Sequence, residues 1–405
     1  LLDAGVAEGL RIDPPGPHGN RVAVDVALPS HLETVVGDER VDGDDLAPSD
    51  EQLHYRRMRP DEALALSRGI HSCYGYSYPD LVYYFPERLA SRVDSADWDS
   101  YVAVNPAGDI VAHLEQDFRD DGHIVYVGGA FTDPRYRGRN LLLKLSESAI
   151  RDREERNPGP VIRYSEAVTT HPITQRIGLS EGQIECGILL GWIPALRQEG
   201  FNDEVVGLQR ASVRPGVMFI GPPEQRTVHP PAFVADYVRR VIEQHDLPRS
   251  VEAPRPRSLE EAPDRTLRVV EVDREMAVAS IMVITIGRDL GDVLAADLQT
   301  LQGQVMHVEL RLPAGDPVLS VAAAGLDELG FVFCAYLPEY RAAGDELRLQ
   351  WLPNAQFDPD ALVLHTEFLQ ELVADVIADV QAAKDRDVDQ RRRRATTRRI
   401  FAALD

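Results

Sequence analysis

The chain has 405 residues, of which 44% are hydrophobic and 27% charged, and its formal net charge is -23 at pH 7. This length fits two domains of roughly 100 to 200 residues each, and the composition is that of a globular protein. No apolar run approaches the roughly 20 residues that cross a bilayer, so a membrane protein is not expected. The negative charge disfavours a nucleic-acid partner, whose phosphates would be repelled, and suits a cationic substrate such as an amine.

The first residues and the cysteines predict a cytoplasmic protein. The N-terminal residues carry acidic groups and no basic region, so they do not have the pattern of a secretory signal. Cys73, Cys186 and Cys334 lie far apart and form no CxxC spacing. This argues against a disulfide framework and against a structural zinc site, and we expect buried, reduced thiols and no metal.

Residues 1–50 are rich in Asp, Gly and Pro, and we expect a loosely packed extension with one strand at 21–29. From Gln52 onward helices and strands are predicted. Their order is helices at 61–76 and 81–94, a hairpin at 100–118, a strand at 123–134, a helix at 140–156, a strand at 161–170, a short helix at 171–182 and a strand at 185–195. This succession predicts an α/β layer architecture.

The second half begins after a change of composition. Residues 212–265 are rich in proline and charge, which predicts a connector with one embedded helix at 232–247. The elements predicted beyond it are strands at 266–273 and 276–286, a helix at 289–303, a strand at 305–313, a helix at 316–330, strands at 331–338 and 345–353, and a long helix from about Asp358. The expected domains are therefore an extension at 1–50, a first domain at 51–211, a connector at 212–265 and a second domain at 266–405.

The two halves share an internal echo. Residues 178–194, GLSEGQIECGILLGWIP, and residues 325–338, GLDELGFVFCAYLP, each give the end of a helix, a glycine, a strand with a cysteine and a proline. We interpret this as a weak structural repeat.

One stretch, FTDPRYRGRNLLLKL at 131–145, has the pattern of an anion site. A glycine-containing loop that opens a helix points several backbone N–H groups one way, and the helix dipole adds to the attraction. Gly138 lets the backbone approach closely, and Arg135, Arg137 and Arg139 add positive charge for more than one phosphate. Asn140 stands where a second small residue is expected, and asparagine tolerates left-handed backbone angles better than most residues.

These residues resemble the Arg/Gln-x-x-Gly-x-Gly/Ala signature of the GCN5-related N-acetyltransferase (GNAT) superfamily, and the predicted elements from about Gln52 to Ala195 follow the same order. The resemblance implies a GNAT-like mixed sheet flanked by helices, with a second, degenerate GNAT-like half. It implies acyl transfer from acetyl-CoA or another acyl-CoA to a small-molecule amine by direct attack in a ternary complex. The residues it assigns to the acyl-CoA are Phe131, Thr132, Arg135, Arg137, Gly138, Arg139, Asn140 and Leu141.

The chain departs from the family at the catalytic positions. The usual glutamate of the central strand falls at about Gly129, and the usual acidic tyrosine of the last helix falls near Gly178. An alkyl ammonium is almost fully protonated near pH 7, so a base is needed. The candidate bases are Glu115, His123, Glu166 and His171, of which we prefer Glu166 and His171.

Two other functions stay open at this point. The chain could be a non-catalytic acyl-CoA-binding or interaction module, because both customary catalytic groups are missing, or it could take the acyl group from a carrier protein. For the basic run Arg391–Arg399 we expect a solvated helix end, or a contact with the protein's own acidic surface or with a second subunit of a homodimer. A nucleic-acid site is less expected on a chain this acidic.

Overall fold

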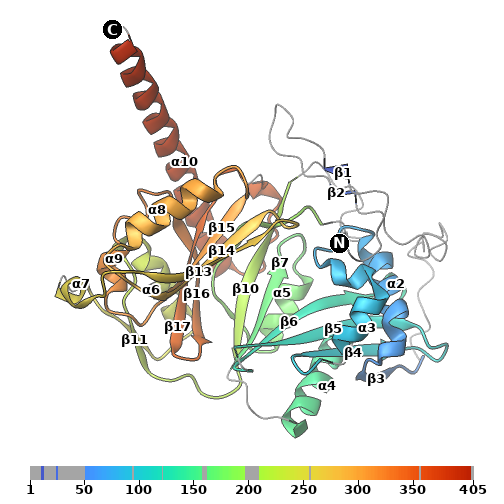
Figure 1. Cartoon of the computed structure of the whole chain (residues 1–405). Coiled ribbons are helices and arrows are strands. Elements are labelled where there is room, and N and C mark those ends of the chain that lie inside the picture. Colours follow the sequence, from blue (N-terminus) through green and yellow to red (C-terminus); the bar gives the residue numbers. More distant parts are fainter. Residues whose placement is uncertain are drawn as a thin grey trace. The chain divides into compact units, whose positions relative to one another are not determined.

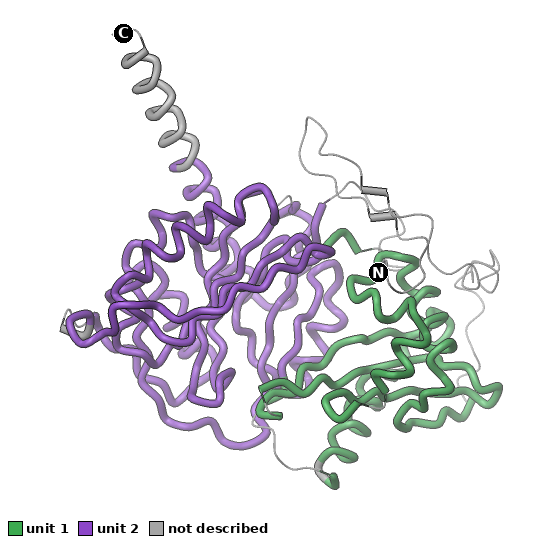
Figure 2. The backbone as a smooth tube through the Cα atoms, in the orientation of Figure 1, with its two compact units in different colours: residues 1–163, 194–208 green, residues 164–193, 209–405 purple. Residues whose placement is uncertain are grey.

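The structure is a computed structural model, drawn in Figure 1. It describes residues 11–12, 24–25, 51–93, 95–120, 122–156, 162–196, 209–254, 257–354 and 357–402, with the backbone alone at 11–12, 24–25, 154, 257–258 and 387–402. Two compact units divide the chain (Figure 2): unit 1 holds residues 1–163 and 194–208, and unit 2 holds residues 164–193 and 209–405. This division falls inside the expected first domain, whose boundaries stay a prediction.

Unit 1 is built on an antiparallel sheet with the neighbour order β3, β4, β5, β6. These strands are β3 (His54–Arg57), β4 (Trp98–Val104), β5 (Ile110–Arg119) and β6 (Ile124–Thr132). β4 and β5 form the predicted hairpin, whose turn is fixed by a hydrogen bond from Asp109 N to Asn105 Oδ1 at 2.8 Å. The hairpin and the strand after it are therefore confirmed.

The helices of unit 1 are α2 (Ala63–Tyr74), α3 (Pro86–Val93) and α4 (Leu141–Arg156), with short 3-10 turns η2 (Pro60–Glu62), η3 (Leu81–Tyr84) and η4 (Pro134–Tyr136). Leu141, Leu145 and Ala149 follow one another at intervals of one helical turn, and α4 buries them in a cluster with Tyr101 and Val111 of the sheet. Each large side chain buried in this way contributes about 1.5–3 kcal/mol. The packing fixes α4 directly after β6 and η4.

Unit 2 begins within β7 (Ile162–Val168) and continues through α5 (Ile173–Ser180), β8 (Ile184–Glu185), β9 (Leu189–Ile193) and β10 (Ala211–Phe219). Within unit 2, β10 lies between β7 and β8, and β9 also pairs with β10. The sequence predicted one strand at 185–195. The structure has two short strands there, because Gly187 and Ile188 pair with Ala335 and Cys334 instead of with β10.

A five-stranded sheet forms the rest of unit 2, in the order β13, β14, β15, β17, β16. Its strands are β13 (Leu267–Asp273), β14 (Val278–Thr285), β15 (His307–Pro313), β16 (Val332–Arg341) and β17 (Gly344–Trp351). Only β14 and β15 are parallel, and they are joined by α8 (Leu290–Leu301). α9 (Leu319–Ala322) is much shorter than the helix predicted at 316–330, and α10 (Glu367–Ala402) begins nine residues later than expected.

The region expected as a connector holds more structure than one helix. Besides α6 (Ala235–Gln244) it contains β10, β11 (Arg226–Val228), β12 (Arg249–Val251) and α7 (Arg257–Glu261). Val228, Val238 and Val241 belong to the main hydrophobic cluster of unit 2. The three strands were missed because prolines flank or interrupt them: Pro215 lies inside β10, and prolines usually mark loops or sheet edges.

The two echo segments meet in unit 2. Ile188 N donates to Cys334 O at 2.8 Å, and Tyr336 N donates to Cys186 O at 2.9 Å. Gly187 and Ala335, which directly follow the two cysteines, form the antiparallel bridge between these bonds. The contact is therefore close to two-fold symmetric, with equivalent residues of the repeat facing each other.

Several expectations concern residues at the limits of the structure. Most of the strand predicted at 21–29 lies outside the described residues, which there include only β2 (Val24–Asp25), paired with β1 (Arg11–Ile12). The backbone of Arg391–Arg399 is helical in α10, and its side chains are outside the described part. In the portion that the structure describes, no helix combines the length and apolar character needed to cross a membrane.

Candidate functional site

The loop between β6 and α4 contains two residues in left-handed backbone conformations. Gly138 has φ +77°, and Asn140 has φ +56° immediately before the helix begins at Leu141. A Cβ atom placed on Gly138 would meet no atom within 4 Å, so the backbone is open to a ligand there. The first turn of α4 has N–H groups without an intrahelical acceptor, as every helix start has. The expectation that Asn140 tolerates a left-handed conformation is confirmed.

The three arginines of the loop differ in their partners. Arg135 is paired with Asp133, with Nη2 donating to Oδ2 at 2.7 Å and Nε donating to Oδ1 at 3.1 Å. Arg139 Nη2 donates to the carbonyl oxygen of Glu51 at 2.7 Å. Arg137 has extended backbone angles, φ -61° and ψ 158°, at the end of η4. Arg135 therefore orders the loop through Asp133, and its charge is largely offset before any ligand arrives.

The other residues assigned to the cofactor are held from behind. Phe131 is 2% exposed, and its ring lies directly over Gly69 of α2, where a Cβ atom would overlap it. The Cys73 thiol donates to the carbonyl oxygen of Thr132 at 3.5 Å. Leu141 is buried in the core of unit 1. Because their side chains are buried, Phe131 and Leu141 can meet a ligand only through their backbone groups.

A β-bulge interrupts β6 shortly before this loop. His113 pairs with Phe131 and Glu115 pairs with Gly128, so β6 has one residue more than β5 between these pairs. Gly129 lies in the bulge with φ +58°. A Cβ atom on Gly129 would overlap the Tyr83 hydroxyl and lie 3.0 Å from Glu115 Cδ, so glycine is required there by both conformation and space.

Glu115 is a buried carboxylate that faces this bulge. It is 5% exposed, accepts a hydrogen bond from Trp98 Nε1 at 2.7 Å, and accepts another, short one from the Tyr83 hydroxyl. Burial raises the pKa of Glu115, and the hydrogen bond from Tyr83 and the charge of Arg92 offset this only in part. Arg92 itself forms an ion pair with Asp80 at 3.0 Å. A buried carboxyl group with a raised pKa is a candidate proton acceptor near neutral pH.

His113 fixes the backbone of the bulge. Its Nδ1 lies 2.6 Å from Gly129 O, and its Nε2 lies 2.7 Å from Ser100 Oγ. Burial lowers the pKa of His113 to about 4, so the ring is neutral at pH 7 and donates from Nδ1 to the carbonyl oxygen. Tyr74 likewise donates to Ala130 O at 2.8 Å. These bonds hold the bulge in one conformation.

The bases preferred from the sequence, Glu166 and His171, lie in unit 2. Glu166 accepts a hydrogen bond from the Tyr164 hydroxyl at 2.6 Å and lies 4.0 Å from Arg348 Nη1. His171 is 6% exposed, and its Nδ1 accepts a hydrogen bond from Ile173 N at 3.3 Å at the start of α5. Both side chains therefore have structural contacts of their own, and their assignment as bases stays a prediction.

His123, the fourth candidate, precedes β6 at the end opposite to the loop. The nine residues of β6 span roughly 30 Å at the usual rise of a strand, so His123 is remote from the loop. Sequence reasoning also missed Tyr83, Trp98 and His113, the partners of the bulge. Their positions depend on strand register, although the sequence HLE at 113–115 placed His113 and Glu115 on one face of a strand.

Within the described residues, no group of three or more His, Cys, Asp or Glu side chains is arranged to hold a metal ion. The three cysteines are buried and form no disulfide, and burial raises the pKa of Cys186 to about 12. A thiol with so high a pKa is a poor nucleophile.

Comparisons with known proteins gave matches among solved structures alone. No family model matches the chain, and no curated protein matches it. Solved structures that match it include acetyltransferases, some of them described as members of the GNAT family. These matches cover about two fifths of the chain.

Three of these structures illustrate the similarity. An acetyltransferase from Acinetobacter baylyi ADP1 is 12% identical, and the match covers 43% of this chain and 95% of that chain with a TM-score of 0.34. A GNAT-family acetyltransferase from Streptococcus pneumoniae is 17% identical, with 42% and 100% covered and a TM-score of 0.32. Arabidopsis thaliana NAA60 in complex with acetyl-CoA is 16% identical, with 42% and 100% covered and a TM-score of 0.33.

Proposed function

We propose that the chain is an N-acyltransferase that moves an acyl group from an acyl-CoA, acetyl-CoA being the simplest, to the amine of a small molecule. The observation that carries this proposal is the turn from β6 into α4. There, a glycine and an asparagine in left-handed conformations lead directly into a 16-residue helix, and arginines flank them. Such a turn is suited to a pyrophosphate, because backbone N–H groups, the helix dipole and cationic side chains converge on it.

Within this turn the chain's own residues would divide the work. The backbone from Arg137 to Leu141 would bind the pyrophosphate, with the Arg137 side chain adding charge. Arg135 would act mainly by ordering the loop, because Asp133 already pairs with it. The backbone of Phe131 and Thr132 would bind the pantetheine arm, since the side chain of Phe131 is buried against α2.

For the proton we propose Glu115. Glu115 accepts a proton from the ammonium group, directly or through water, and the neutral amine nitrogen then attacks the thioester carbonyl carbon. The carbon–sulfur bond breaks, and the thiolate takes the second proton, which the nitrogen loses as the amide forms, so that CoA leaves as a thiol. Two features support this role: the raised pKa of the carboxyl group, and the glycines at 128 and 129, which keep side chains away from it. Glu166 and His171 remain the rival candidates.

We further propose that unit 2 contains a second GNAT-like half without a cofactor loop. The support is topological: β10 lies between β7 and β8, and β17 likewise lies between β15 and β16. In both cases the inserted strand is the last of the three in the chain. No segment like RYRGRN accompanies β14 and α8 in the sequence, so the cofactor is assigned to the first half alone.

The test of the proposed function has a binding arm and a turnover arm. Calorimetry with acetyl-CoA should show binding that weakens at least tenfold in the double variant Arg137→Ala/Gly138→Ala, and much less in the control Arg135→Ala. Release of free CoA thiol with a panel of amines should follow the same order.

The outcomes separate the alternatives. Acetyl-CoA binding without thiol release on any amine would indicate a non-catalytic acyl-CoA-binding module. No binding of acetyl-CoA, with activity on an acyl-loaded carrier protein, would indicate the carrier as the donor. Unchanged affinity and activity in the double variant would show that the pyrophosphate site lies elsewhere.

A further inference from the structure

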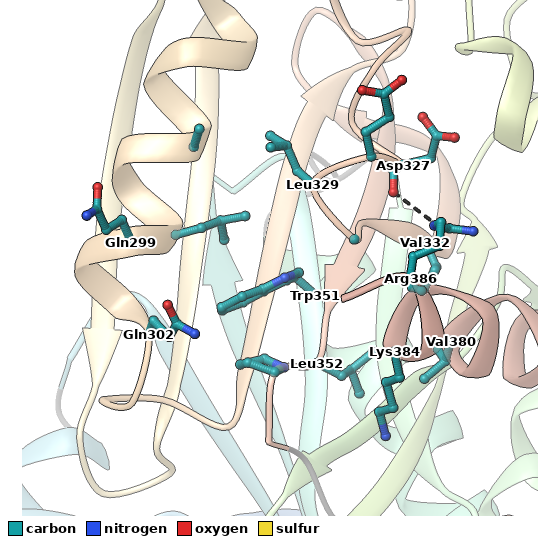
Figure 3. A pocket seen from close by; sticks show the side chains of 16 residues that line it. Gln299, Gln302, Asp327, Leu329, Val332, Trp351, Leu352, Val380, Lys384 and Arg386 are labelled. Carbon is teal, nitrogen blue, oxygen red and sulfur yellow. Dashed lines mark hydrogen bonds between the residues drawn. The ribbon is translucent and has the colours of Figure 1, made fainter. Parts of the chain in front are cut away.

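A pocket in unit 2 lies between α8 and α10, at the end of β17. Its volume is about 510 Å³, within the range of small-ligand sites. The turn at 327–330, which leads into β16, closes it on a third side, as Figure 3 shows. All residues that line it belong to unit 2, so the pocket is separate from the β6–α4 turn of unit 1.

Four apolar side chains form part of the lining of this pocket. They are Leu298 of α8, Val332 of β16, Val380 of α10 and Leu352, which directly follows β17, and each is at most 6% exposed. Trp351 is half-buried and also lines the pocket (Figure 3). A ligand with an aliphatic or aromatic body would gain hydrophobic and stacking contacts here.

The indole of Trp351 is kept in place by the turn at 327–330. Gly330 has φ +92°, and a Cβ atom there would lie 3.3 Å from both Cδ1 and Nε1 of the indole. This is tighter than an ordinary van der Waals contact, so glycine lets the turn approach the ring. The flat face of a large aromatic side chain is thus a fixed part of the pocket.

Opposite charges stand at the two ends of the pocket. Asp327 and Glu328 lie on the turn, and Arg386 of α10 is held beside them by a hydrogen bond from Nη2 to Asp327 O at 3.3 Å. Two carboxylates and one guanidinium group thus give this end a net negative formal charge. Lys384 lies at the other end, below Arg386 in the view of Figure 3, with Trp351 to the left of both.

The lysine itself is unusual in this chain. Of the 43 basic residues, Lys144 and Lys384 are the only lysines, and all others are arginines. Nearly every basic residue of the chain is therefore an arginine, including Arg386 in the pocket. Lys384 instead places a compact ammonium group at its end of the pocket.

We infer that this pocket binds a zwitterionic ligand with an apolar body, of which an apolar α-amino acid is the simplest example. The ligand's ammonium group faces Asp327 and Glu328, its carboxylate faces Lys384, and its side chain lies on Trp351. The site is distinct from the acceptor site of the proposed acyl transfer, because it lies in the half to which no cofactor is assigned. It would give that half a binding function of its own.

The test is calorimetric titration of the full chain, without acyl-CoA, using L-phenylalanine as the probe. 3-Phenylpropionate lacks the ammonium group and 2-phenylethylamine lacks the carboxylate, and each should bind at least tenfold more weakly. Lys384→Ala and the double variant Asp327→Ala/Glu328→Ala should each weaken phenylalanine binding at least tenfold. Asp385→Ala is the matched control and should bind as the wild type does, because its carboxylate accepts a hydrogen bond from Gln381 on the same helix.

A control separates this site from the proposed acceptor site, since phenylalanine also carries an amine. Binding that persists in Glu115→Gln and is lost in Lys384→Ala places the ligand in unit 2, whether or not the chain transfers acyl groups. Three results would overturn the inference: no phenylalanine binding at millimolar concentration, equal binding of 3-phenylpropionate, or binding that the Lys384 and Asp327/Glu328 variants leave unchanged.

Discussion

Replacing Glu115 by glutamine tests the central step of the proposed reaction. The change keeps the size of the side chain and the acceptor oxygen for Trp98 or Tyr83, but it removes the group that would take the proton. A positioned base contributes roughly 10²- to 10⁴-fold to a rate, so acyl transfer to an alkyl amine should slow by about that factor. The affinity for acetyl-CoA should not change, because Glu115 is not part of the loop before α4.

The pH dependence should change with the rate. The pKa of Glu115 is raised by burial, so the acidic limb of kcat/KM in the wild type should lie above the ordinary glutamate pKa of about 4.3. Glu115→Gln should lose this limb. The raised pKa also means that the folded protein binds this proton more tightly than the unfolded chain does. Wild-type stability, measured relative to the variant, should therefore fall as the pH rises from about 4.3 through the folded-state pKa.

The assay measures free CoA thiol with two acceptors. An alkyl amine is protonated near pH 7 and needs the base, whereas an arylamine is already neutral and needs it much less. Glu115→Gln should therefore slow transfer to the alkyl amine far more than transfer to the arylamine. Glu166→Gln serves as the comparison variant. If Glu115→Gln kept the wild-type rate with both acceptors while Glu166→Gln abolished it, the assignment of Glu115 would be refuted.

Three further predictions concern conformation and stability, each measured by denaturant unfolding. Asn140→Ala should destabilise unit 1 by about 1 kcal/mol through its left-handed backbone, whereas Asn140→Gly should be nearly neutral. Gly187→Ala should destabilise unit 2 by at least about 2 kcal/mol, because the new Cβ atom would overlap Cys334 O. Burial alone would raise the pKa of Glu346, but neighbouring arginines, Arg348 among them, lower it to about 2. Wild-type stability should therefore fall between about pH 4.3 and pH 2, and Glu346→Gln should remove this dependence.

Each of these three predictions can fail in a recognisable way. Equal stability of the alanine and glycine variants at position 140 would mean that the residue does not hold its left-handed conformation in solution. If Gly187→Ala left the free energy of unfolding unchanged, the two echo segments would not be in contact. If the stability of Glu346→Gln fell between about pH 4.3 and pH 2 as much as that of the wild type, the Glu346 carboxylate would not be held by the surrounding arginines.

The sequence was most informative where a short pattern decides the local structure. The NPAGD turn, the apolar spacing of α2 and α4, and the loop around Gly138 follow from neighbouring residues, and the structure confirms them. The helix predicted at 316–330 was too long. Its apolar residues have helical spacing, but only four residues form α9 and the rest turn toward β16.

The candidate base shows what a sequence does not contain. Glu115 and Gly129 are brought together by the register of β5 against β6, which is shifted by the bulge, and Tyr83 arrives from a separate 3-10 turn. None of these relations is visible in residue spacing. Glu166 and His171 were preferred because they follow the motif helix in the chain, while their contacts with Tyr164 and the start of α5 depend on tertiary packing.

The bridge between Gly187 and Ala335 has the form of a homodimer contact enclosed within one chain. A protein with only one of the two echo segments would expose that strand as an edge, and two copies could close it around a true symmetry axis. Joining both copies in one polypeptide makes the contact independent of concentration. It also removes the requirement that the two segments stay alike, so that under the proposed function one half can carry a cofactor loop that the other lacks.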